Sequence, residues 1–122
     1  MIIFNRPYDP ERYRYGGCVH FDQISVEQAL ELLKKGFIDP DDTQNCSPTM
    51  QEFIDYVSDE PDKWYLHGYA IGPDRTDCRV TFEGIGSYAP LDAEEALDFI
   101  KYFRYADEVD AGTDTCAYCW YD

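Results

Sequence analysis

Two runs of aromatic and β-branched residues, 64–71 and 78–85, constrain this chain most strongly. Side chains of these types favour the extended backbone of a strand. The runs are separated by residues 72–77, Gly-Pro-Asp-Arg-Thr-Asp, a turn-forming segment that contains Gly, Pro and two Asp residues. The spacing therefore predicts that the two runs pair as a hairpin.

A first helix is predicted to begin at Ser25. Ser25 and Gln28 have the spacing of a capping box, in which each side chain bonds the backbone amide of the other residue. Apolar residues follow at helical spacing, and Gly36 comes directly after Lys34 and Lys35. A basic last turn followed by glycine is typical of a helix end.

Two further helices are predicted. Ser47 before Pro48 suggests an N-cap followed by proline in the first turn, and this second helix should end near Ser58. The third helix should begin at the acid-rich segment that starts with Asp92. The apolar stripes of the three helices predict burial of Leu30, Leu33, Phe53, Ile54, Leu97 and Ile100.

Short strands are also expected at residues 2–5, 18–21 and 115–121. The predicted order is then strand, helix, helix, hairpin, helix, strand. This order favours the α+β class, with three helices packed against a mixed or antiparallel sheet of about four strands. No internal repeat or low-complexity linker divides the chain, so residues 1–122 are expected to form a single domain.

The charge of the chain restricts its partners. Twenty-five Asp and Glu residues against ten Lys and Arg residues give a net charge of -15. Such a surface repels nucleic-acid phosphates and anionic membranes and attracts basic proteins. The apolar start of the chain is too short for a signal peptide, and five cysteines are an odd number, so we expect a cytoplasmic protein with reduced thiols.

Cys116 and Cys119 have the spacing of a metal clamp or a redox pair. Cys18 and His20 could complete a four-ligand zinc site. Against this, residues three apart in a strand point to opposite faces. A small zinc protein or an enzyme of unknown reaction is therefore the alternative interpretation, and the main one includes no metal and no cofactor.

Catalytic motifs are scarce. His20 and His67 are the only histidines, and no glycine-flanked serine nucleophile is present. Residues 84–87, Gly-Ile-Gly-Ser, lack the third glycine and the basic residue of a phosphate-binding loop. We therefore expect a protein that is not an enzyme.

The acidic residues are unevenly distributed, because residues 38–62 contain eight acids and no Lys, Arg or His. Tyrosine and tryptophan, which often anchor protein interfaces, lie among and just after them. Alternation along residues 64–71 places Tyr65, His67 and Tyr69 on one strand face and Trp64 on the other, so that one face could be core and the other a partner site. The predicted partner-binding residues are Asp39, Asp41, Asp42, Glu52, Asp55, Asp59, Glu60, Asp62, Tyr56, Trp64, Tyr65 and Tyr69.

In general composition the chain resembles the small acidic accessory proteins of phages and mobile elements that inhibit nucleases by imitating the charge of nucleic acid. The resemblance carries no residue-by-residue correspondence. It implies a protein-interaction module whose carboxylates occupy the basic nucleic-acid-binding surface of a partner protein. We take this as the functional hypothesis.

Overall fold

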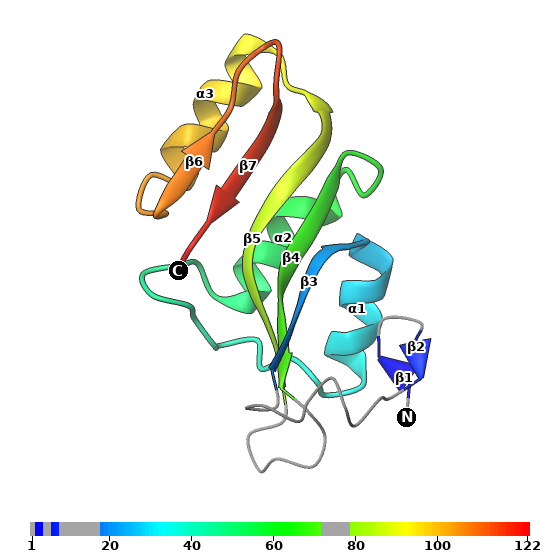
Figure 1. Cartoon of the computed structure of the whole chain (residues 1–122). Helices are drawn as coiled ribbons and strands as arrows, with labels where there is room; N and C mark the ends of the chain where they lie inside the picture. The colour runs from blue at the N-terminus through cyan, green and yellow to red at the C-terminus, as the bar shows by residue number, and fades with distance from the viewer. Residues whose placement is uncertain (1, 4–5, 8–17, 72–78) are drawn as a thin grey trace.

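The computed structural model describes residues 2–3, 6–7, 18–71 and 79–122 (Figure 1). Five strands form one antiparallel sheet in the order β3-β4-β5-β7-β6, and two short strands, β1 and β2, pair separately. The strands are β1 Ile2–Ile3, β2 Arg6–Pro7, β3 Cys18–Ile24, β4 Trp64–Ile71, β5 Arg79–Pro90, β6 Glu108–Asp110 and β7 Cys116–Trp120. The helices are α1 Val26–Lys34, α2 Met50–Ser58 and α3 Ala93–Tyr102.

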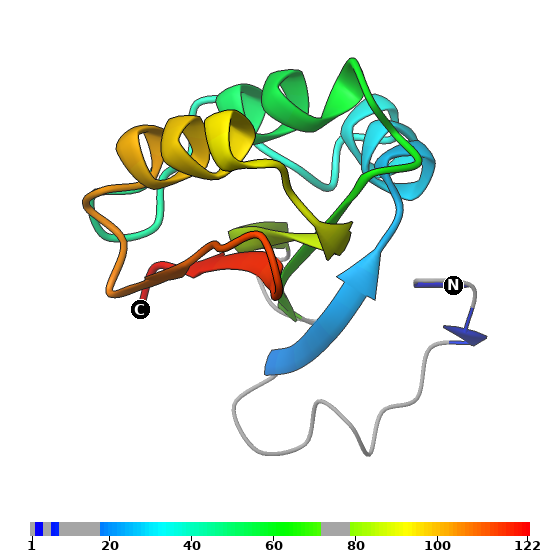
Figure 2. The same ribbon diagram turned by 90° about the horizontal axis from the view of Figure 1, so that it is seen from above.

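The three helices all lie on one face of the five-stranded sheet, as Figure 2 shows. This arrangement confirms the predicted α+β class, with an entirely antiparallel sheet. The two predicted strands of the hairpin pair with each other, because β4 pairs with β5 along its whole length, and the predicted turn at residues 72–77 lies outside the described residues. The strands β2 and β6 were not predicted, since their sequences Arg-Pro and Glu-Val-Asp have little strand propensity. Within the described ranges, no helix has the length and apolar character needed to cross a membrane.

The helix starts follow from local hydrogen bonds. The predicted capping box of α1 is formed, with the Ser25 amide donating to Gln28 Oε1 at 2.9 Å and the Gln28 amide to Ser25 Oγ at 3.1 Å. The predicted cap of α2 was wrong, because Thr49 is the N-cap in place of Ser47. Thr49 has Glu52 three residues later, and the two residues form a second capping box.

Helix α1 ends as its sequence predicts. Gly36 has a φ of 83°, a left-handed conformation that glycine adopts without steric cost. The amide of Phe37 donates to the carbonyl of Leu32 at 3.0 Å, which satisfies a carbonyl in the last turn of the helix.

Aromatic side chains dominate the contact between the helices and the sheet. Trp64 on β4 stacks on Phe99 of α3, with ring centroids 5.8 Å apart. Phe53 of α2 stacks on Phe103 at 6.1 Å and also contacts Tyr121. All five rings are buried in the core. Stacked and edge-to-face rings contribute about 0.5–1.5 kcal/mol per pair beyond their burial.

The predicted buried faces were partly wrong. Phe53 and Ile54 are buried as predicted, and Leu33 is half-buried. Leu30, Leu97 and Ile100, however, are 44%, 60% and 38% exposed. Helix α3 carries a second apolar stripe, which consists of Ala96, Phe99 and Phe103. This stripe is the one that packs on the sheet, since two phenylalanine rings bury more apolar surface than Leu97 and Ile100 would.

Paired substitutions on α3 test this orientation. Phe99→Ala should lower the free energy of unfolding by about 3–5 kcal/mol, because it leaves a cavity beside Trp64. Leu97→Ala should change it by no more than about 0.5 kcal/mol, because Leu97 is exposed. Urea titration followed by circular dichroism measures both values. Equal losses in the two variants would show that the helix faces the other way.

Candidate functional site

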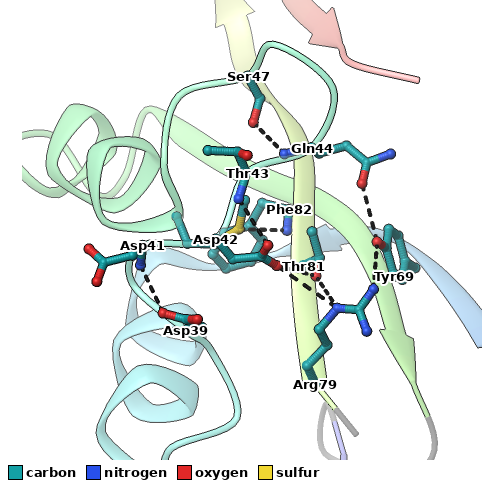
Figure 3. Close-up of polar contacts among 11 residues, drawn as sticks. Asp39, Asp41, Asp42, Thr43, Gln44, Ser47, Tyr69, Arg79, Thr81 and Phe82 are labelled. Carbon is teal, nitrogen blue, oxygen red and sulfur yellow. Dashed lines mark hydrogen bonds and ion pairs between the residues drawn. The ribbon is translucent and has the colours of Figure 1, made fainter. Parts of the chain in front are cut away.

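The loop between α1 and α2 lies along one edge of β5 (Figure 3). It contains three of the predicted partner-binding acids, Asp39, Asp41 and Asp42, and Asp42 contacts β5. The amide of Val80 donates to the carbonyl of Phe37 at 2.7 Å, and the amide of Phe82 to Met50 Sδ at 3.1 Å. Asp42 accepts a hydrogen bond from Thr81 at 3.2 Å and lies 3.9 Å from Arg79 Nε. The carboxylate of Asp42 therefore binds side chains of β5 within the protein.

Asp39 and Asp41 lie in the same loop but remain exposed. The amide of Asp41 donates to Asp39 Oδ1 at 3.0 Å, which is a local turn contact visible in Figure 3. Glu60 forms an ion pair with Lys63 at 3.4 Å, and Lys63 also pairs with Glu95 of α3. Asp62 is exposed, just beyond the end of α2.

Helices α2 and α3 together present an outward-facing group of acids, which we call the acidic ridge: Glu52, Asp55, Asp59 and Asp98. Tyr102 lies between the two helices, 41% exposed, with its ring 4.8 Å from that of Tyr56. Burial raises the pKa of Tyr102, and the carboxylates of Glu52 and Asp55 raise it further. These carboxylates are thus close enough to act on the phenol electrostatically.

The predicted aromatic anchors do not join the acids on one surface. Trp64 is buried in the core, and Tyr56 is half-buried against Trp64, Phe99 and Phe103. Burial raises the pKa of Tyr56 to about 12. Tyr65 lies on the opposite face of the sheet from the helices, together with Tyr69. The twelve predicted residues are therefore divided among the β5 edge loop, the helix layer, the core and the far face of the sheet.

The alternative zinc ligands are also separated. Cys116 is exposed, whereas Cys119 is buried on the helix side of β7. Cys18 and His20 belong to β3, which is three strands away from β7 in the sheet, a separation of about 14 Å at ~4.8 Å per strand. Within the described ranges, no group of three or more His, Cys, Asp or Glu residues is placed to hold a metal ion.

Thiol labelling tests the placement of the two cysteines. Burial raises the pKa of the Cys119 thiol to about 12, so little of the reactive thiolate forms at neutral pH. Iodoacetamide at pH 7.5 should modify Cys116 in the native protein and Cys119 only after denaturation, as measured by peptide mass spectrometry. Equal native labelling of both would contradict this assignment.

The far face of the sheet contains a concave pocket of about 400 Å³. No described helix covers this face (Figure 2). Two irregularities meet at His67 and Gly68 of β4. Glu83 is an extra residue between Phe82 and Gly84 on β5, and on β3 the register shifts between Phe21 and Ile24. Bulges of this kind redirect side chains and often lie beside functional sites.

The pocket is lined by His20, Phe21, Asp22, Gln23, Tyr65, His67, Gly68, Glu83, Tyr118 and Trp120.

Two glycines of β5 make room for the pocket residues. A Cβ on Gly84 would lie 2.6 Å from His67 Nε2 and 1.9 Å from the carbonyl oxygen of Cys119. A Cβ on Gly86 would lie 2.3 Å from the ring of Tyr65. The Gly-Ile-Gly sequence therefore lets these two rings lie against the neighbouring strand, a role that sequence reasoning missed.

The pocket side chains are held by specific contacts. His67 Nε2 lies 2.7 Å from the carbonyl oxygen of Cys119, and the His67 ring stacks on Tyr118 with centroids 4.8 Å apart. The Glu83 side chain is 9% exposed. Trp120 Nε1 donates to Glu83 Oε2 at 3.4 Å, and His20 Nδ1 lies 3.3 Å from Glu83 Oε1. The pocket thus combines a fixed carboxylate, a buried imidazole and aromatic rings.

The pH dependence of stability tests the state of His67. Burial lowers its pKa below the usual value of 6.5, although the hydrogen bond to Cys119 and the carboxylates of Glu83 and Asp22 oppose this shift. Below about pH 6.5 the unfolded chain binds a proton that the folded chain does not, so protonation favours unfolding. The stabilisation is complete above pH 6.5 and is lost as the pH falls from there towards the lower folded-state pKa.

His67→Gln keeps an amide donor for the Cys119 carbonyl and removes this titration. The parent protein should therefore lose stability relative to the variant between pH 7 and 5, by at most about 1.4 kcal/mol per pH unit. Urea titration at each pH measures the difference. Parallel pH profiles for the two proteins would contradict a buried, neutral His67.

No protein-family model, curated protein or solved structure matches the chain.

Proposed function

We propose that the protein is a non-enzymatic binding module whose acidic ridge engages the basic surface of a partner protein. The observation that carries the proposal is the position of Glu52, Asp55, Asp59 and Asp98 on the outside of the helix layer. No ion pair joins any of these four carboxylates to a base among the described residues. A basic partner would supply the missing counter-charge.

The spacing of the acids supports this interpretation. Glu52, Asp55 and Asp59 are three and four residues apart, so they lie on one side of α2. Like charges at this spacing destabilise a helix by about 0.2–0.5 kcal/mol per pair. Binding to Lys and Arg side chains of a partner would remove this repulsion and would also speed encounter through long-range attraction.

In its most specific form, the proposal is that the ridge imitates the charge of nucleic acid. Its carboxylates would then occupy the phosphate-binding sites of a nucleic-acid-binding protein. Tyr102 lies between the acids and remains 41% exposed, and it would supply the aromatic contact that interfaces favour. This role differs from the predicted one, in which Tyr56 and Trp64 were the anchors of this surface.

The test compares two variants that lose the same charge. Asp55→Asn, Asp59→Asn and Asp98→Asn remove three charges from the ridge. In the control, Glu27→Gln, Asp110→Asn and Asp114→Asn remove three exposed charges elsewhere. A partner recovered from the native host is used for stopped-flow measurement of association. The ridge variant should associate about tenfold more slowly at low salt, since steering contributes about 10- to 1000-fold.

The control variant should associate at nearly the parent rate. Raising the ionic strength should slow the parent protein more than the ridge variant, because salt screens the attraction over about 10 Å at 0.1 M. If the partner binds nucleic acid, added nucleic acid should compete with the parent protein for it. Equal slowing of both variants would show that only net charge matters and that the ridge is not the binding surface.

A further inference from the structure

We propose that the pocket on the far face of the sheet binds an organic cation of the ammonium or guanidinium class, such as the side chain of a lysine or an arginine. The pocket lies on the opposite side of the sheet from the acidic ridge. The proposal therefore does not depend on the function proposed for the ridge.

Acceptors for a cation come from three pocket residues. Glu83 holds its carboxylate in a 9% exposed position at the β5 bulge, and Asp22 adds an exposed carboxylate from β3. His67 Nε2 must donate to the Cys119 carbonyl, because a carbonyl oxygen only accepts. The neutral ring therefore keeps Nδ1 as a third acceptor.

Aromatic rings complete the pocket. Tyr65, Tyr118 and Trp120 line it from β4 and β7, and all three are half-buried. The faces of such rings attract cations, with the strongest effect at tryptophan and at sites shielded from water. Tyr118 is held in place by stacking on His67, and Trp120 by its contact with Glu83. The site is thus formed before any ligand arrives, which lowers the entropy cost of binding.

The same face of the sheet already holds one cation in this way. The guanidinium of Arg79 lies 5.8 Å from the ring centroid of Tyr69 and pairs with the carboxylate of Asp42 (Figure 3). A carboxylate and a tyrosine ring thus bind an arginine side chain within the protein itself. Around Glu83 the corresponding groups line an open pocket, and none of its described lining residues is Lys or Arg. His20 Nδ1 lies 3.3 Å from Glu83 Oε1, but its side chain is 70% exposed, so the imidazole lies at the open side of the pocket.

Anions and neutral polar ligands fit this pocket less well. Two carboxylates at the site and a net charge of -15 repel an anion. A neutral ligand would have to replace water around the Glu83 carboxylate without supplying a counter-charge, which is costly for a group that is largely buried. The chemistry of the pocket therefore selects a cationic donor.

The experiment titrates the unaltered protein with each probe and follows binding by isothermal titration calorimetry. The probes are N-acetyl-arginine amide, N-acetyl-lysine amide and an arginine-containing tripeptide amide with neutral neighbours. N-acetyl-citrulline amide, which is neutral and nearly identical to arginine in shape, is the matched control ligand. The arginine probes should give a saturable change, and citrulline should bind at least about tenfold more weakly, which corresponds to about 1.4 kcal/mol.

Two variants locate the binding site. Glu83→Gln keeps an acceptor for Trp120 and should weaken binding of the arginine probe about tenfold or more. Asp22→Asn removes the other carboxylate of the pocket and should weaken binding several-fold. Because Asp22 is exposed, this variant should fold even if Glu83→Gln does not. Asp55→Asn on the acidic ridge should leave binding unchanged, which separates this site from the ridge.

The pattern of probes identifies the source of the cation. Tighter binding of the tripeptide than of the free amides supports a side chain of a partner protein, and equal binding supports a small free cation. Both results agree with the proposal. It is overturned if no cationic probe saturates the signal, if citrulline binds as well as arginine, or if folded Glu83→Gln and Asp22→Asn proteins bind arginine as tightly as the parent.

Discussion

Stacking of Phe99 on Trp64 is the contact on which the arrangement of the helix layer depends. It determines which side of α3 faces the sheet, and with it the positions of all the other side chains of that helix. Tyr102 then points towards α2, where it meets Tyr56, and Asp98 faces outwards near the acids of α2. The acidic ridge is thus a consequence of the aromatic core beneath it.

The two sides of β4 have separate roles because side chains alternate along a strand. Trp64, Leu66 and Ala70 face the helices and belong to the core, whereas Tyr65 and His67 face the pocket. One eight-residue strand therefore supports both the stability of the domain and its pocket. A shift of this strand by one residue would exchange the two sets, so the register of β4 with β5 is important for both.

Much of the fold follows from local patterns in the sequence. The hairpin of β4 and β5, the capping box at Ser25 and the end of α1 at Gly36 were all predicted, because each depends on residues close together in the chain. The orientation of α3 was not, because apolar side chains lie on two sides of the helix and contacts with distant residues decide which side is buried.

The pocket was less predictable than the fold. Alternation placed Tyr65, His67 and Tyr69 on one face of a strand, but the sequence contains no local sign of the bulge at Glu83. Nor does it show that Tyr118 and Trp120, from the far end of the chain, reach the same place. Gly84 and Gly86 could have been a clue, because two glycines within a strand indicate close approach of neighbouring atoms.

The loop along β5 also affects how copies of the protein meet. A strand with free amides and carbonyls can pair with a strand of another molecule, which is a common route to aggregation. The loop engages the amides of Val80 and Phe82, and a contact between Asn45 and the Asp122 carbonyl ties it to the C-terminal residue. The outer strand β6 has only three residues, two of them acidic. These features leave little free backbone on this side of the sheet for a strand of another molecule to pair with, so they disfavour edge-to-edge pairing there.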